Sequence, residues 1–231
     1  KELGDKKMMA ISYNNIATIY YDQSNETEAL KYNLASLKLK EETNDKLGKS
    51  FSYNNIGSIY ATLGNYSSAI NYHLDALKIR EEIGDKIGII GSLTNLGFVY
   101  TKSKKFDLAK QHLDRALALA KESGKKSKIQ DTYQKMTLLD SALGNFSSAL
   151  ENHKLYVAYK DSLLNEENNK QIAQMKTIYE TEKKDNEIVL LNKDKVIQEK
   201  EITKQKLVRN GFVGGFAVVL LFAGVIFTQR N

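Results

Sequence analysis

Three histidines are the side chains in this chain best suited to acid–base chemistry or metal binding. His73, His112 and His153 follow one another at about one period of a forty-residue internal repeat, and His73 and His153 hold the same repeat position. A repeated position usually packs against a neighbouring helix, so we expect packing roles for these residues. The sequence has no cysteine, and it shows no glycine-rich phosphate loop, metal-ligand spacing or serine elbow. We therefore expect no catalytic residue, no metal and no cofactor, and the visible chain is predicted not to be an enzyme.

Side-chain amides form the second group with usable chemistry. Residues 11–21, 51–61 and 91–100 contain no Asp, Glu, Lys or Arg, although charged residues make up 27% of the chain. These segments display a recurring set of polar side chains: Asn14, Asn15, Asn54, Asn55, Thr94 and Asn95. Each amide can both donate and accept, which suits hydrogen bonding to a peptide backbone. The alternative is that they bond between adjacent repeats and help to set the superhelix.

The net charge of +6 has one local source. Residues 102–128 hold nine Lys or Arg against three Asp or Glu, with Phe106 as the single aromatic side chain among them. A nucleic-acid surface would interleave more aromatic residues with such a cluster. A solvated helix face is therefore the favoured interpretation, and no nucleic-acid partner is expected.

The elements that position these residues follow from the repeat. The segments 11–50, 51–90, 91–130 and 131–170 align without a gap, and one small residue recurs in each, as Ala29, Ala69, Ala109 and Ala149. A fixed period of this size is typical of a stacked solenoid, in which each unit buries its apolar face against its neighbours. The complete absence of proline favours helices throughout. Lys1 to Lys7 lie one period before similar stretches and no Met begins the chain, so we assign residues 1–10 to the end of a truncated preceding repeat.

Each repeat is predicted to be two antiparallel helices. Gly64 and Gly144 suit the left-handed residue that ends a helix, and Asn65 suits the cap of the next one. Lys104-Lys105 is a weaker stop. The Asn-x-Ser/Thr triplets at Asn25, Asn65 and Asn145 look like glycosylation acceptors, but they recur because helix caps recur.

Several of these positions fall in the order and spacing of a known repeat. They are Tyr53, Ile56, Gly57, Tyr60, Gly64, Tyr66, Ala69 and Ala76. Residues 11–164 resemble tetratricopeptide (TPR) repeats, which implies an all-α solenoid of helix pairs. The period is forty rather than thirty-four, and Glu41 and Glu81 stand where that family often has proline. The fourth unit departs furthest, with Asp140 in place of Tyr and Tyr156 in place of Ala, and is expected to act as a polar-faced cap.

The resemblance implies that the first helix of each pair lines a ligand groove. By that resemblance Asn15, Asn55 and Asn95 are the expected peptide contacts. The family's clamp for acidic C-termini needs Lys and Arg on these same helices, and residues 11–21, 51–61 and 91–100 have none. We therefore expect a neutral or mixed extended peptide.

The chain changes character after the repeats. Residues 165–210 are charged and lack Gly and Pro, and Met175, Val189, Val196 and Thr203 share a seven-residue grid that charged residues interrupt. A coiled coil and a single solvated connector helix both stay open. Residues 211–228 are uncharged and, as a helix of 18 residues, would span about 27 Å, which predicts a transmembrane helix. Gly211 and Gly215 form a G-x-x-x-G pair within it.

This order of parts resembles the input half of bacterial membrane signalling proteins common in the Bacteroidetes. The resemblance implies a periplasmic TPR sensor, a single inner-membrane span and a missing output module: a histidine kinase, a nucleotide cyclase or a helix-turn-helix regulator. A homodimer through the connector and the span is part of this expectation. The basic residues Lys204, Lys206 and Arg209 before the span, against Arg230 after it, would by themselves place the repeats in the cytoplasm. The alternative function is a membrane-tethered TPR scaffold for protein complex assembly.

Overall fold

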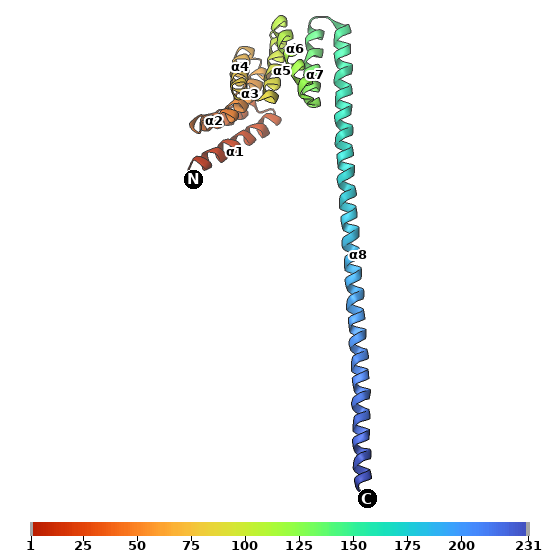
Figure 1. The fold of residues 1–231 in the computed structure, drawn as a ribbon. Coiled ribbons are helices and arrows are strands. Elements are labelled where there is room, and N and C mark those ends of the chain that lie inside the picture. Colours follow the sequence, from red (N-terminus) through yellow and green to blue (C-terminus); the bar gives the residue numbers. More distant parts are fainter. Residues whose placement is uncertain (1, 230–231) are drawn as a thin grey trace. The chain divides into compact units, whose positions relative to one another are not determined.

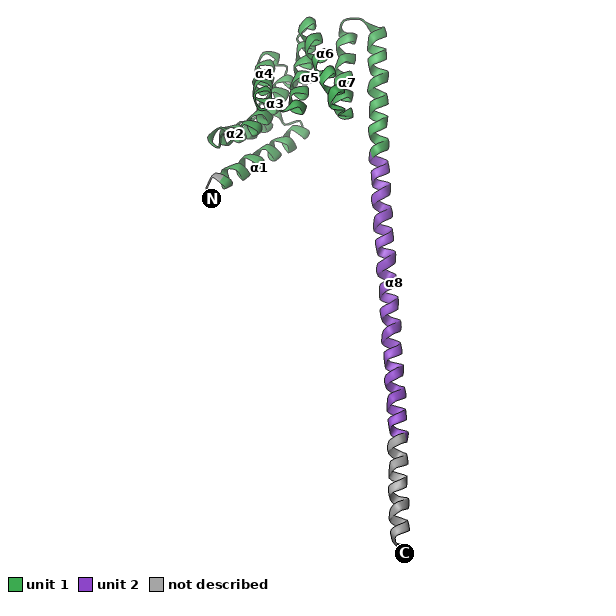
Figure 2. Ribbon diagram, viewed as in Figure 1, with its two compact units in different colours: residues 1–166 green, residues 167–231 purple. Residues whose placement is uncertain are grey.

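A computed structural model describes the backbone of residues 2–229 and the side chains of residues 4–212. Its eight helices, joined by short turns with no strand between residues 2 and 229, are shown in Figure 1. They are α1 (Glu2–Asp22), α2 (Glu26–Glu42), α3 (Lys46–Thr62), α4 (Tyr66–Ile83), α5 (Lys86–Lys102), α6 (Phe106–Ser123), α7 (Lys126–Ala142) and α8 (Phe146–Gln229). The chain divides into two units, residues 1–166 and residues 167–231 (Figure 2).

Unit 1 is a stack of helix pairs. Helix α1 packs on α2, α3 on α4 and α5 on α6, and each pair continues into the next through α2 with α3, α4 with α5 and α6 with α7. The first helices α3, α5 and α7 also contact one another in order. The predicted all-α, TPR-like solenoid is confirmed by this arrangement.

The turns repeat the same backbone geometry. A residue with positive φ, between 51° and 77°, stands at each of them: Ser24, Asn44, Gly64, Gly84, Lys104, Gly124 and Gly144. The side chain of Asn65 accepts a hydrogen bond from Ser68 N at 3.1 Å, which satisfies one of the free N–H groups at the start of α4. The predicted stops at Gly64 and Gly144 and the cap at Asn65 are therefore present. Lys105 caps α6 without a side-chain hydrogen bond.

The start of α1 is helical at residues that the repeat register aligns with a turn. The register aligns Gly4-Asp5 with the turn at Gly84-Asp85, but Gly4 and Asp5 lie inside α1. The Gly84-Asp85 turn is held by a backbone bond from Asp85 N to Arg80 O at 2.9 Å, made to the helix before it.

One packing position shows how the stack ends. Tyr60 and Tyr72, on the two helices of a pair, stack with ring centroids 5.5 Å apart, and Tyr20 with Tyr32 does the same. In the fourth repeat the equivalent residues are Asp140 and Asn152, and Asn152 Nδ2 donates to Asp140 Oδ2 at 2.7 Å. A hydrogen bond at the exposed end of the stack replaces an apolar contact, which fits the expected polar-faced cap.

Two glycines on first helices make room for side chains of the second helices. A Cβ on Gly57 would come within 2.9 Å of the His73 ring, and one on Gly97 within 2.4 Å of Leu113. His73 and Leu113 are almost fully buried at these crossings. The small residue lets the two helices of each pair approach closely.

Unit 2 is the continuation of α8. Every side chain described between residues 167 and 212 is exposed, including Ile172, Met175 and Val189. Within the portion of the chain whose side chains are described, no helix is long and apolar enough to cross a membrane. Of the predicted transmembrane segment 211–228, residues 213–228 lie outside that portion.

Candidate functional site: the groove along the first helices

Three neighbouring hollows run across the first helices of unit 1. The first, of about 200 Å³, lies between α1 and α3, and the second, of about 310 Å³, reaches from α1 to α7. They share Tyr21 and Ser58. The third, of about 440 Å³, extends over α3, α5 and α7 and shares Asn95 and Lys135 with the second. Because neighbouring hollows share side chains, we treat them as one channel, called here the first-helix groove.

The predicted amides bond to one another between repeats. Asn55 Nδ2 donates to Asn14 Oδ1 at 3.2 Å, and Asn95 Nδ2 donates to Asn54 Oδ1 at 2.9 Å. These bonds connect α1 to α3 and α3 to α5, which is the inter-repeat alternative left open by the sequence. Each bond leaves the Oδ1 atom of Asn55 and of Asn95 available to accept, so the same residue can also bind a ligand. The predicted peptide contact therefore stays a prediction for these residues.

Some of the predicted peptide-binding residues line the groove and others do not. Asn54, Asn55, Thr94 and Asn95 line it. Thr94 is buried, and its hydroxyl donates to Ile90 O at 2.8 Å and lies 3.3 Å from the Thr132 hydroxyl. Asn14 and Asn15 lie outside the three hollows, and Asn15 is exposed.

The sequence pattern assigned no charged residue to the groove, and Lys128 fell in the basic cluster of residues 102–128, for which a solvated helix face was favoured. The third hollow is lined by Lys128, Asp131 and Lys135 of α7 and by Arg80 of α4. Helix α7 belongs to the degenerate fourth repeat, and Arg80 lies on a second helix, so the pattern of three charge-free first helices indicated neither of them. A signal for Arg80 was present, because Lys40 and Arg80 share a repeat position and each precedes a serine by twelve residues, Ser52 and Ser92.

Lys135 has an unusual setting. Its Nζ lies 4.6 Å from the centroid of the Phe98 ring, and the Nζ of Lys102 lies 5.7 Å from the same centroid. Burial lowers the pKa of Lys135, with Lys102 acting in the same direction and Asp131 opposing. Lys135 makes no salt bridge to any side chain in the described part of the chain. A cation stabilised by a ring face rather than by a carboxylate is free to attract an anionic group.

His73 and Asn33 form the floor of the groove. They hold equivalent positions in α4 and α2, are 1% and 2% exposed, and line the second and the first hollow. Nδ1 of His73 and Oδ1 of Asn33 have no hydrogen-bond partner among the described residues. Burial lowers the pKa of His73 to about 4, and the positive charge of Arg80 adds to the effect. His73 is therefore neutral at pH 7.

The remaining histidines form no site. His112 Nδ1 lies 2.7 Å from Leu108 O, and its ring lies 5.1 Å from Tyr100. His153 is exposed. No group of three or more acidic or histidine side chains in the described residues is placed to hold a metal ion.

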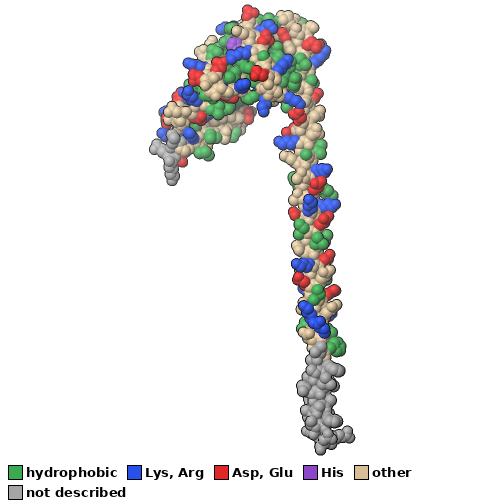
Figure 3. Space-filling view, viewed as in Figure 1, with side chains coloured by type: hydrophobic (Ala, Val, Ile, Leu, Met, Phe, Trp, Pro, Cys, Tyr) green, Lys and Arg blue, Asp and Glu red, His purple; other side chains and the backbone are tan. Residues whose placement is uncertain are grey.

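On the face of unit 1 in Figure 3, basic and acidic side chains are interspersed.

The comparisons with known proteins agree with this geometry. The family described as tetratricopeptide repeat matches residues 8–82 and again residues 89–123. Residues 8–82 and 89–123 are thus similar to tetratricopeptide repeats. This fold suits protein–protein interaction and is typically non-catalytic, in keeping with the expectation that the visible chain is not an enzyme. No curated protein matches the sequence.

Solved structures share the TPR fold at low identity. BtubC from P. vanneervenii has a TM-score of 0.60 and 19% identity, over 68% of this chain and 65% of its own. Aspartyl phosphate phosphatase F from Bacillus subtilis has a TM-score of 0.62 and 18% identity, over 68% of this chain and 42% of its own. The apo form of RapI has a TM-score of 0.60 and 21% identity, over 68% and 44%. The chain thus spans 65% of the first and less than half of the other two.

Proposed function

We propose that the first-helix groove binds an extended segment of a partner protein. The observation that carries this proposal is the continuity of the three hollows across α1, α3, α5 and α7, which gives a channel longer than a small-molecule pocket. Its walls are made largely of hydroxyls, amides and aromatic rings, which can hydrogen-bond and pack against a peptide. A neutral or mixed peptide is the proposed ligand class.

The whole protein is proposed to be a membrane-anchored signalling protein. In this proposal the repeats lie in the periplasm, residues 211–228 span the inner membrane, and an output module follows. Helix α8 runs without a break from Phe146 to Gln229, so it joins the last repeat to that segment in one element. Partner binding that changes the packing of α7 on the start of α8 would be passed along this helix. Reporter fusions at either end test the orientation.

The second candidate is a membrane-tethered scaffold without an output module. The groove along the first helices supports protein binding equally in both cases. The protein sequence that follows Asn231 separates them, because a kinase, cyclase or regulator domain supports signalling, whereas a chain ending soon after Arg230 supports the scaffold.

The peptide role of Asn55 is separable from its inter-repeat bond. Asn14→Ala and Asn55→Ala remove the same hydrogen bond, but of these two residues only Asn55 lines the groove. We expect Asn55→Ala to weaken binding about tenfold, because a lost hydrogen bond to a ligand contributes about 1 kcal/mol or more, and Asn14→Ala to leave it unchanged. Asn95→Ala should act as Asn55→Ala does.

The measurement is fluorescence polarisation on the full chain in detergent micelles, with labelled peptides selected from a random display library. Thermal unfolding of the same variants reports stability. Equal losses of binding and of stability in Asn14→Ala and Asn55→Ala would assign both residues to the architecture of the repeats.

A further inference from the structure

Arg80 is a buried cation that makes no salt bridge to a described side chain; burial lowers its pKa, and the nearby Asp85 carboxylate opposes that effect. It is 3% exposed and lies in the last turn of α4. Its Nη1 donates to Gly88 O at 2.9 Å and to Ser92 Oγ at 2.7 Å, and its Nε donates to Ser50 Oγ at 3.4 Å. Nη2 makes no hydrogen bond, and the guanidinium makes no salt bridge, to any residue with a described side chain. Buried charged groups normally have all their donors satisfied, and here Nη2 has no partner among the described residues.

The other repeats show that the fold does not require this guanidinium. Lys40 holds the equivalent position in the first repeat, is 5% exposed and donates from Nζ to Ser52 Oγ at 2.9 Å. Lys40 lines none of the three hollows of the groove. In the third repeat the position is Ala120, which is fully buried. A junction between repeats therefore forms with a lysine or with no cation at this position. The unused Nη2 donors of Arg80 are available to a ligand.

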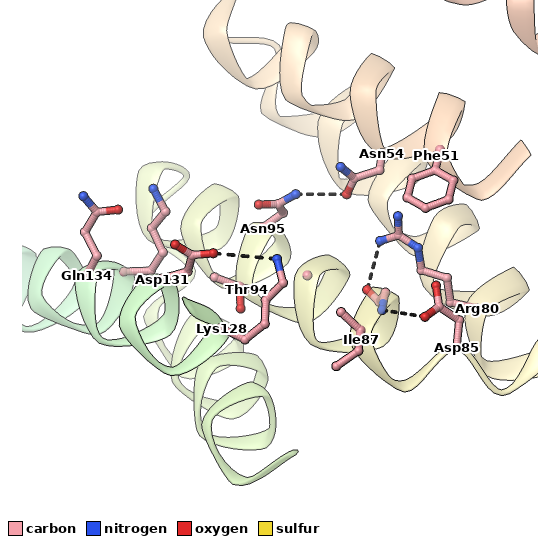
Figure 4. Close-up of a pocket in the computed structure, with 13 residues that line it drawn as sticks. Phe51, Asn54, Arg80, Asp85, Ile87, Thr94, Asn95, Lys128, Asp131 and Gln134 are labelled. Carbon is pink, nitrogen blue, oxygen red and sulfur yellow. Dashed lines mark hydrogen bonds and ion pairs between the residues drawn. The ribbon is translucent and has the colours of Figure 1, made fainter. Parts of the chain in front are cut away.

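Those donors lie at the third hollow. The ring centroid of Phe51 is 5.4 Å from Arg80 Cζ. Figure 4 shows Arg80, Phe51, Asn54 and Asn95 around the same space, with Asn54 Nδ2 not used in the bond to Asn95. An incoming group at this place would meet a guanidinium and an amide N–H, both of them donors.

The charge of the hollow is positive on balance. Three cations line it, Arg80, Lys128 and Lys135, against two carboxylates. Both carboxylates are already engaged, since Asp85 Oδ1 accepts from Gly88 N at 2.9 Å and Asp131 pairs with Lys128 at 3.7 Å. A ligand with a negative charge would complete the set.

We propose that the peptide bound in the first-helix groove carries an acidic side chain, Asp or Glu, that enters the third hollow and is bound by the Arg80 guanidinium, with Asn54 donating beside it. This proposal rests on the proposed peptide-binding function. The planar donors of arginine match a carboxylate, and two such donors can bind its two oxygens at once. The groove thereby selects among peptides at one position.

The experiment uses the full chain in detergent micelles and a random dodecapeptide display library. Peptides selected by the unaltered chain should be enriched in Asp or Glu at one position, and replacing that residue by Asn or Gln should weaken binding at least about tenfold. For Arg80→Ala, which copies the third repeat, the acidic peptide and its amide counterpart should bind equally. Lys40→Ala is the matched control and should keep the preference.

The outcomes of this experiment separate the acidic-side-chain inference from the proposed peptide binding. If Arg80→Ala does not fold by circular dichroism, Arg80→Lys, which copies the first repeat, replaces it and should reduce the preference because the planar fork is lost. Selected peptides without acidic enrichment, or a preference unchanged in the Arg80 variants, would overturn this inference while leaving peptide binding intact. Selection of no peptide at all would instead overturn the proposed function. If a phosphoserine peptide bound far more tightly than the glutamate peptide, the carboxylate assignment would be overturned in favour of a phosphate group.

Discussion

At the residue scale, the floor of the groove is polar but partly unsatisfied. His73 is held between Gly57 and the hollow above it, with Nδ1 lacking a partner in the described chain. Such a group is costly in the folded state, and functional surfaces are where proteins retain costly groups. His73 also makes the stability of the repeats depend on pH.

The pH dependence follows from the lowered pKa of His73. This pKa falls from 6.5 to about 4 on folding, so above pH 7 the residue is neutral in both states and has no effect. As the pH falls from about 6.5 toward 4, the unfolded chain takes up a proton that the folded chain does not, and about 3 kcal/mol of stability is lost. Burial is the larger cause, and the positive charge of Arg80 on the same helix also disfavours the protonated ring.

The test is urea unfolding between pH 7.5 and 4.5. His73→Leu copies Leu113 of the next repeat and should remove part of the loss at low pH, whereas His153→Leu, at an exposed position, should remove none. Identical pH profiles for His73→Leu and the unaltered chain would contradict the assignment. Protonation of carboxylates contributes equally to all three proteins.

At the element scale, the third repeat has the weakest helix boundary. Lys104 has φ of 59° where Gly64 and Gly144 occupy the same turn elsewhere, and Lys105 does not cap α6 with its side chain. A left-handed backbone costs a residue with a Cβ about 1 kcal/mol, and a missing N-cap costs about as much. The boundary is tolerated because Leu113 and Ala116 of α6 are fully buried against their neighbours.

Lys104→Gly with Lys105→Asn should therefore stabilise the chain. The double variant copies Gly64-Asn65, and we expect a gain of about 1–2 kcal/mol in the free energy of unfolding. Chemical denaturation followed by circular dichroism measures it. The reverse exchange, Gly64→Lys with Asn65→Lys, should destabilise by a similar amount. Unchanged stability in both double variants would mean that packing alone sets these turns.

At the whole-molecule scale, the part of α8 in unit 2 carries apolar side chains that no described residue covers. In proteins most of the stability of a helix comes from packing its apolar face against another surface. Ile172, Met175, Val189 and Val196 lie on the seam of the seven-residue pattern and are all exposed. We propose that two copies pair along this seam as a parallel coiled coil.

The absence of cysteine makes this pairing simple to measure. In a parallel, in-register pair, Val196→Cys faces its own counterpart and should form a disulfide under mild oxidation. Asp194→Cys, two residues away and off the seam, is the matched control and should not. Equal cross-linking at both positions, or none at Val196→Cys, would contradict the parallel pairing.

The sequence alone determined the repeated architecture. The forty-residue period, the lack of proline and the Gly and Asn signals at the turns are local or periodic properties, and each repeat meets only its neighbours. For that reason the helix pairs, the stops at Gly64 and Gly144 and the cap at Asn65 can be inferred from local sequence. The left-handed turn at Lys104 was harder to predict, since lysine has no preference for that conformation.

The tertiary structure decided which side chains share the groove. Whether Asn55 meets Asn14 depends on the offset between α1 and α3, and no periodicity contains that offset. The presence of Arg80 from a second helix, and of Lys135 from the degenerate fourth repeat, depends on how closely the first helices approach. The approach of the two helices within a pair is likewise decided by tertiary contacts, Gly57 against His73 and Gly97 against Leu113, because close packing across a helix crossing is a property of pairs of residues distant in sequence.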